Sequence, residues 1–118
     1  MKLRYEKSMR VLTDIMGYCH LIGGQHFSVD FNMSGSQTEI EIKTQLAQVE
    51  QSELDNLNTM LNIPRQREVE QYYWNISGEE EIDNELSLAG MMVDEATVAY
   101  EDGVLTVTAL RLDASDEA

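Results

Sequence analysis

The stretch FSVDFNMSGSQTEIEIK, residues 27–43, has the clearest structural pattern in this chain. Apolar and polar residues alternate over 27–31 and again over 39–43, and the residues between them, at 32–36, include Asn, Ser and Gly. Strict alternation is typical of a strand with one buried face, and the intervening residues are typical of a turn. The stretch therefore predicts a β-hairpin with one apolar face.

The segment before this hairpin, residues 8–22, has the periodicity of a helix. Its apolar residues recur three and four positions apart and form a wide apolar face. Ser8 is expected to cap the start of the helix, and Gly23 and Gly24 to follow its end. Packing the apolar face on the hairpin would give two layers, a helix on a sheet.

The middle of the chain is also predicted to be helical. Ser52 is expected to cap a helix that Pro64 ends, because a proline inside a helix loses a hydrogen bond and clashes with the preceding turn. A second helix is expected from about residue 65 to 76. The apolar residues within 86–93 suit a short buried helix.

A closing hairpin is predicted over 97–110, with Asp102-Gly103 as its turn. A chain of 118 residues is long enough for one domain. We therefore expect an α+β fold, a two-layer α/β sandwich with helices packed on one face of a mostly antiparallel sheet. The single domain would span 1–118, with an ordered core of about 8–112 and a polar tail at 113–118.

The charge of the chain is strongly negative, with 22 Asp and Glu against 8 Lys and Arg, a net −14. This balance argues against nucleic-acid binding and against docking on an anionic membrane, because both need cationic patches. Four basic residues among the first ten, against one acidic residue, are expected to meet the acidic body of the same chain or of a second copy. Five carboxylates within 79–85 lack the spacing of a calcium loop and are interpreted as solvated.

The single cysteine, Cys19, is expected to be a buried apolar residue of the first helix. His20 is its neighbour in sequence, but adjacent helical residues project in different directions and do not form a catalytic pair. A zinc site with His26 would lack a fourth ligand at a recognised spacing. The N-terminus shows no apolar run of a secretory signal, so a cytoplasmic protein is expected.

The chain resembles the ATP-binding domain of histidine kinases and related Bergerat-fold ATPases. The resemblance rests on the element order and on three local stretches. Residues 12–24 resemble the first helix of the family, which carries a magnesium-binding Asn. Residues 39–54 resemble the stretch that bears its Asp-x-Gly-x-Gly motif, and residues 85–89 resemble the Gly-Leu-Gly-Leu-Ala that opens its final helix.

Every nucleotide-binding position of the resembled motifs is altered. An isoleucine at the Asn position offers no oxygen to magnesium, and bulky residues at glycine positions obstruct the approach of a nucleotide. A glutamate at the phosphate end would repel a triphosphate. The resemblance therefore implies a degenerate domain that binds neither ATP nor magnesium, and no cofactor is expected. The substituted positions are Ile15, Thr44, Leu46, Gln48, Glu85 and Ser87.

Five apolar side chains are candidates for an interaction surface: Tyr72, Tyr73, Trp74, Met91 and Met92. Three consecutive aromatic residues on a helix cannot all face one core, and Tyr and Trp are enriched in protein interfaces. Adjacent methionines suit an adaptable binding surface. Packing in the core and at its edge is the alternative role of these side chains.

These observations predict a non-catalytic regulatory or protein-interaction module with a protein partner or a second copy of itself. The alternative is a small hydrolase or metal-dependent enzyme that uses an acidic cleft in place of the nucleotide pocket. An enzyme should bring carboxylates or His20 together in a concave pocket. An interaction module should instead expose Tyr72, Trp74 or Met91, or bury them in a dimer.

Overall fold

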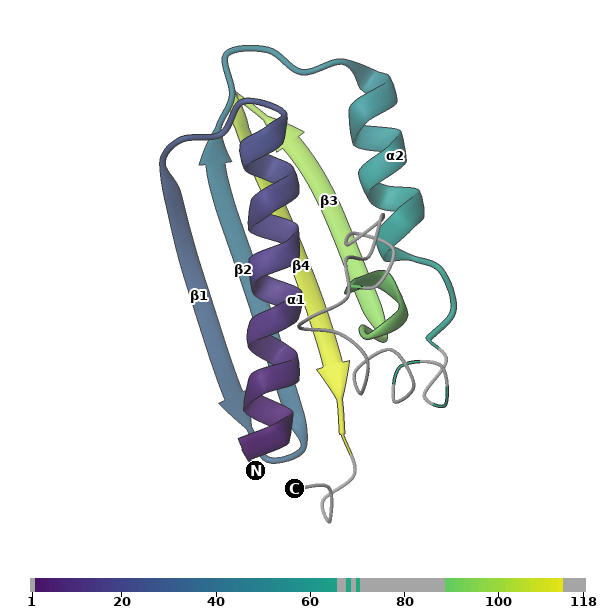
Figure 1. Cartoon of the computed structure of the whole chain (residues 1–118). Coiled ribbons are helices and arrows are strands. Elements are labelled where there is room, and N and C mark those ends of the chain that lie inside the picture. The colour runs from purple at the N-terminus through teal and green to yellow at the C-terminus, as the bar shows by residue number, and fades with distance from the viewer. Residues whose placement is uncertain (1, 66–67, 69, 71–88, 114–118) are drawn as a thin grey trace.

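Two helices cover one face of a four-stranded antiparallel sheet (Figure 1). The computed structural model describes residues 2–65, 68, 70 and 89–113. The α+β class and the two-layer arrangement expected from the sequence are confirmed. The elements are, in chain order, α1 (Lys2–Leu21), β1 (Phe27–Ser34), β2 (Gln37–Gln45), α2 (Gln51–Leu61), β3 (Glu95–Glu101) and β4 (Val104–Leu112).

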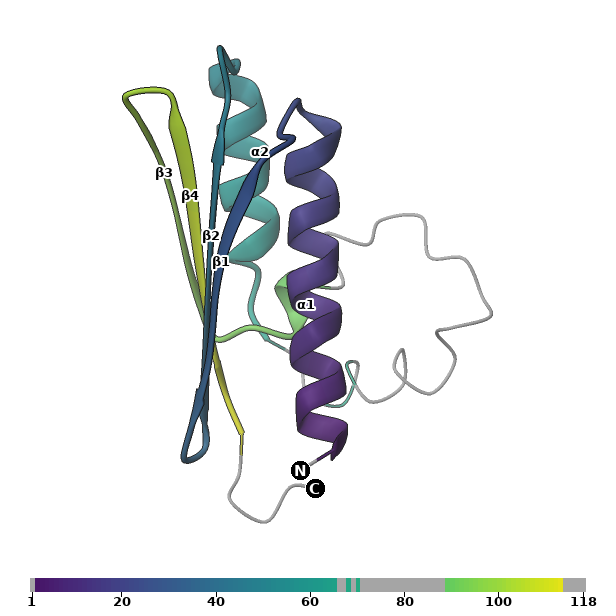
Figure 2. The same cartoon turned by 90° about the vertical axis from the view of Figure 1, so that its left-hand side faces the viewer.

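The strand order is β1-β2-β4-β3, so the closing hairpin places β4 beside β2. Paired residues of neighbouring antiparallel strands share a face of the sheet. One such row runs through Phe31, Ile40, Ala109 and Ala96 and faces the helices. Figure 2 shows both helices on this inner face, while the outer face carries no helix of the described chain.

The core lies between α1 and the two central strands. Val11, Ile15 and Cys19 of α1 are buried against inner-face residues such as Ile42 and Val107. Burial of each such side chain contributes roughly 1.5–3 kcal/mol, so this layer is a main source of stability. The expected burial of Cys19 is confirmed.

The helix start expected at Ser8 is wrong. Helix α1 begins at Lys2, and Ser8 is completely buried within it. The apolar period does end near this point, but Arg4 and Lys7 continue the same buried face with charged side chains. The buried stripe of α1 changes here from apolar to charged residues. The apolar pattern of the sequence therefore did not indicate nearly two turns at the start of the helix.

Ser52 does not cap α2. The N-cap is Glu50, whose side chain makes no capping bond, and whose carbonyl accepts the backbone N–H groups of Glu53 and Leu54. The helix ends at Leu61, three residues before Pro64, as the proline led us to expect. Of the second helix predicted over 65–76, residues 68 and 70 are helical, and most of the remainder lies outside the described residues.

Both predicted hairpins are confirmed. In the second, Asp102 and Gly103 adopt φ of 53° and 80°, the left-handed conformations of a two-residue hairpin turn. Residues 89–91 are helical, and the earlier part of the short helix predicted within 86–93 lies outside the described residues. Asp113 was assigned to a polar tail, whereas its side chain is buried.

Candidate functional site

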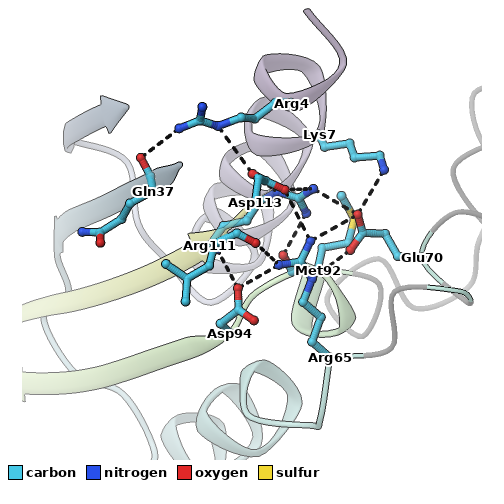
Figure 3. Close-up of polar contacts among 10 residues, drawn as sticks. Arg4, Lys7, Gln37, Arg65, Glu70, Met92, Asp94, Arg111 and Asp113 are labelled. Atoms are coloured by element: carbon cyan, nitrogen blue, oxygen red, sulfur yellow. Dashed lines mark hydrogen bonds and ion pairs between the residues drawn. The ribbon is translucent and has the colours of Figure 1, made fainter. Parts of the chain in front are cut away.

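A cluster of charged side chains, most of them buried, lies where the start of α1 meets the end of β4 (Figure 3). We call it the charge cluster. Its members come from α1, from the segment after α2, from the residue before β3, and from β4 with the residue that follows it. They are Arg4, Lys7, Arg65, Glu70, Asp94, Arg111 and Asp113.

Arg111 stands at the centre of the charge cluster. It faces the helices from β4 and is 1% exposed. Its guanidinium donates to Glu70 Oε2 at 3.0 Å, to Asp113 Oδ2 at 3.2 Å and to the Met92 carbonyl at 3.0 Å. A planar guanidinium distributes its donors over several acceptors in this way, which an ammonium group does less well.

The carboxylate of Glu70 forms ion pairs with three basic side chains. Lys7 Nζ lies 3.1 Å from Glu70 Oε2, and Arg65 Nε lies 3.1 Å from Glu70 Oε1, in addition to the Arg111 contact. Burial alone would raise the pKa of Glu70, but the charges of Arg111 and Arg65 and the hydrogen bond from Lys7 outweigh it and lower the pKa. Glu70 is therefore held as an anion.

The remaining contacts of the charge cluster join Arg65 and Arg4 to residues at the ends of β2, β3 and β4. Arg65 donates to Asp94 Oδ2 at 2.8 Å and to the Leu112 carbonyl at 2.7 Å. Arg4 donates to the Gln37 carbonyl at 3.1 Å, and its Nε lies 3.5 Å from Asp113 Oδ2. The cluster thus ties four distant segments of the chain together.

The charge cluster holds segments of the fold together. Its carboxylates are neutralised by cations that are themselves buried, so it offers neither a base nor an electrophile to a substrate. The basic residues near the N-terminus contact carboxylates of their own chain. Arg4 and Lys7 do so within the charge cluster, and Arg10 pairs with Asp14. Arg4 and Lys7 have helical spacing to Val11 and Ile15, and this spacing could have indicated that they lie on the buried face of α1. The prediction of a later helix start did not use this signal.

A surface hollow of about 560 Å³ lies between the end of α1 and the start of α2. Gln48, Glu50 and Glu53 supply its polar lining, and Ile22 and Val49 its apolar lining. Tyr18 donates its hydroxyl to Glu53 at 3.1 Å nearby. Among the described residues, no three His, Cys, Asp or Glu side chains are grouped so that they could hold a metal ion.

The positions of the resembled nucleotide motifs fall in different environments. Ile15 is 0% exposed and belongs to the core, and Leu46 and Thr44 are also buried. Gln48 is exposed and lines the hollow. The positions at 85 and 87 lie outside the described residues.

The histidines do not join Cys19 in a site. His20 Nδ1 lies 2.8 Å from the carbonyl oxygen of Gly24, and His26 lies exposed beside β1. Burial raises the pKa of the Cys19 thiol to about 11, so it is protonated and poorly nucleophilic at neutral pH.

The expected interaction residues are only partly placed. Met92 is 1% exposed and belongs to the core, so it does not contribute to a surface of the folded chain. Met91 is half-buried against the core. Residues 72–74, with both tyrosines and the tryptophan, lie outside the described residues.

The outer face of the sheet is a polar surface that no described helix covers, and we call it the acidic face. It comprises the residues that alternate with the inner rows on all four strands, and none of its side chains is buried. Its charged members are five carboxylates and a single lysine. They are Asp30, Glu39, Glu41, Glu95, Glu101 and Lys43.

Charges of the same sign stand directly opposite one another on this face. Asp30 of β1 pairs with Glu41 of β2, and Glu39 follows Glu41 on the same side of its strand. Like charges at directly opposed positions of a sheet are destabilising. The acidic face thus costs stability that a neutral or mixed-charge face would not.

No family model matches this chain, and no curated protein matches it. None of the described helices is long and apolar enough to cross a membrane.

Proposed function

We propose that this protein is a non-catalytic regulatory or protein-interaction module that binds a basic surface of another protein through its acidic face. The observation that carries the proposal is the excess of carboxylates on a sheet face that no described element covers. A partner that brings Lys or Arg side chains would relieve the repulsion between Asp30 and Glu41. Binding would thereby recover the stability that the free face loses.

We test this function with affinity capture from host extract, using the chain and two double variants of equal charge. Glu39→Gln with Glu41→Gln removes two charges from the acidic face. Glu50→Gln with Asp55→Asn removes two exposed charges from the helix side. We expect the same proteins to be retained by the unaltered chain and by the helix-side variant, and to be lost or weakened with the acidic-face variant. Equal retention by all three chains contradicts the proposal.

We also propose that the chain is a degenerate relative of histidine-kinase-type ATPase domains that no longer binds ATP. The support is that Ile15 and Leu46, at two altered motif positions, are core residues whose side chains occupy the interior. Titration calorimetry with ATP and magnesium should give no binding heat. Micromolar binding would sink this part of the proposal.

A further inference from the structure

We infer that the outer edge of β1 binds an extended, positively charged segment of the partner protein, which joins the sheet as a fifth strand. This inference rests on the proposed function above and adds where the basic partner binds and in which conformation. It follows from three features of β1: an edge that no described residue pairs with, an apolar row on its inner side, and Asp30, backed by Glu41 of β2, on its outer side.

Strand β1 is an edge strand whose only charged residue is Asp30 and which lacks most of the usual protection. It pairs with β2 through eight consecutive residues and contains no bulge, and its sequence FSVDFNMS has no lysine, proline or glycine. Natural edge strands are commonly protected by lysine, proline, bulges or short length, because their unpaired backbone groups otherwise accept another strand. In Figure 1 no described element lies against the outer edge of β1.

The inner side of β1 carries apolar surface that α1 does not cover. The ring of Tyr5 packs edge-on against Phe31, with ring centroids 5.9 Å apart. Tyr5 remains 50% exposed, and Val29, which also faces the helix side, remains 42% exposed. Alternate side chains of an added strand would cover Val29 and Phe31, and apolar side chains suit those positions best.

The carboxylate on the outer side of β1 favours a positively charged residue in the added strand. Asp30 lies there between Ser28 and Asn32, and Glu41 stands directly behind it on β2. A Lys or Arg placed opposite Asp30 would form a cross-strand pair of opposite charge. The complementary segment is therefore extended, with apolar residues opposite Val29 and Phe31 and a Lys or Arg opposite Asp30.

The other edge of the sheet is less suited to this role. Helix α2 lies over β3 (Figure 1), and a hollow of about 280 Å³ between them is lined by polar groups of Asp55, Asn58 and Gln51 as well as by Leu54, Val98 and Tyr100. An added strand at β3 would place its inner side chains against these polar groups. The inner row of β3, Ala96, Val98 and Tyr100, is half-buried, whereas Val29 of β1 is 42% exposed, so β1 offers the more accessible apolar surface to a new strand.

Charge also favours a basic segment over a second copy of this chain. Pairing β1 with β1 of another copy would bring together two molecules of net charge −14 and their two acidic faces. Repulsion of this kind opposes association most strongly at low ionic strength. A cationic segment gains from the same field.

The test uses the full chain and an eight-residue peptide in which Lys and Val alternate, matching the length of β1. One control peptide has the same composition with the four Lys and four Val in separate blocks. A second control keeps the alternation but carries N-methyl groups on alternate backbone nitrogens of the edge that pairs. We expect the alternating peptide to shift the amide resonances of residues 27–34 and to slow their hydrogen exchange, and both controls to bind more weakly.

Matched variants of the chain locate the contact. Asp30→Asn should weaken the alternating peptide about twofold to fivefold, as expected for one exposed ion pair, and Glu101→Gln at the opposite edge should not. Val29→Ser should also weaken binding, whereas Leu21→Ser, which removes an exposed apolar side chain at the end of α1, should have no effect. Each variant is checked for an unchanged fold by its amide spectrum.

The possible results separate this inference from the proposed function. If the N-methylated peptide binds as well as its parent, or the shifts centre on β3 or β4, the strand-addition inference is overturned while binding of basic partners by the acidic face stands. If β1 is protected without peptide, in step with a dimer seen by light scattering, a second copy is the occupant and the inference is overturned. If no cationic peptide binds and the acidic-face variant captures the same proteins as the unaltered chain, both fail.

Discussion

Glu70 is a residue on which the charge cluster depends strongly, because three basic side chains converge on its carboxylate. Glu70→Gln leaves those cations buried with only partial compensation, so we expect a loss of about 3 kcal/mol in the free energy of unfolding at pH 7. Urea unfolding measures it. Glu68→Gln, an exposed neighbour, is the control and should change stability little.

The same carboxylate makes stability depend on pH. Its pKa in the folded chain is lowered, so its stabilising contribution is present above the pKa of an unfolded glutamate, about 4.3. The contribution is lost as the pH falls from there through the lowered folded pKa. The unaltered chain should therefore lose more stability than Glu70→Gln between pH 5 and pH 3, and parallel losses in both chains would contradict this assignment.

Cys19 should be inert in the folded protein. Its thiol is 1% exposed and burial raises its pKa to about 11, so both access and thiolate fraction are low. Iodoacetamide at pH 8 should leave Cys19 unmodified without urea and modify it fully in urea, as intact mass spectrometry would show. Thr13→Cys, on the exposed side of α1, supplies the control and should take one added group under native conditions. Rapid modification of native Cys19 would mean that the core opens there.

Among the helical elements, two glycines predict opposite effects of the same substitution. Gly17 lies on the exposed side of α1, and an added methyl group would meet no atom within 4 Å. Gly17→Ala should therefore stabilise the chain by roughly 0.5–1 kcal/mol through helix propensity. An added methyl group at Gly90 would overlap the carbonyl oxygen of Met60, so Gly90→Ala should destabilise the chain by about 1–3 kcal/mol. Thermal unfolding compares the two, and stabilisation by Gly90→Ala would disprove the close packing of residues 89–91 on the end of α2.

Elements whose burial is apolar could be predicted from the sequence, and those whose burial is charged could not. Alternation identified both hairpins, and Asp102-Gly103 identified the second turn. The start of α1 was missed because Arg4 and Lys7 are buried against partners far along the chain, which include Asp113 and Glu70. A local pattern carries no information about such partners.

For the molecule as a whole, the sequence predicts the acidic residues of the candidate surface but not the edge of the sheet beside them. The alternation of Glu39 and Glu41 with isoleucines shows that these carboxylates share a face. Which strand has a free edge depends instead on β4 pairing with β2, and this order is set by the packing of the two hairpins under α1 and α2. The unprotected edge of β1 therefore appears only once the sheet is assembled.

The net charge of −14 leads to a prediction for the molecule as a whole. Added salt shortens the Debye length from about 30 Å at 0.01 M to about 3 Å at 1 M, and it screens exposed charges far more than buried ones. Among the described residues, like charges stand opposite one another on the acidic face, whereas the closest buried attractive pairs lie in the charge cluster. Sodium chloride should therefore raise the free energy of unfolding, measured by urea denaturation.

Glu41→Lys gives this prediction its internal control. The substitution places a positive charge between Asp30 and Glu39, so the repulsion that salt relieves is already reduced. The variant should be more stable than the unaltered chain at low salt, and the difference should shrink as salt is added. If salt instead destabilises the unaltered chain, exposed attractive pairs outweigh the repulsion, and the acidic face then lacks the stored electrostatic cost that a basic partner is proposed to relieve.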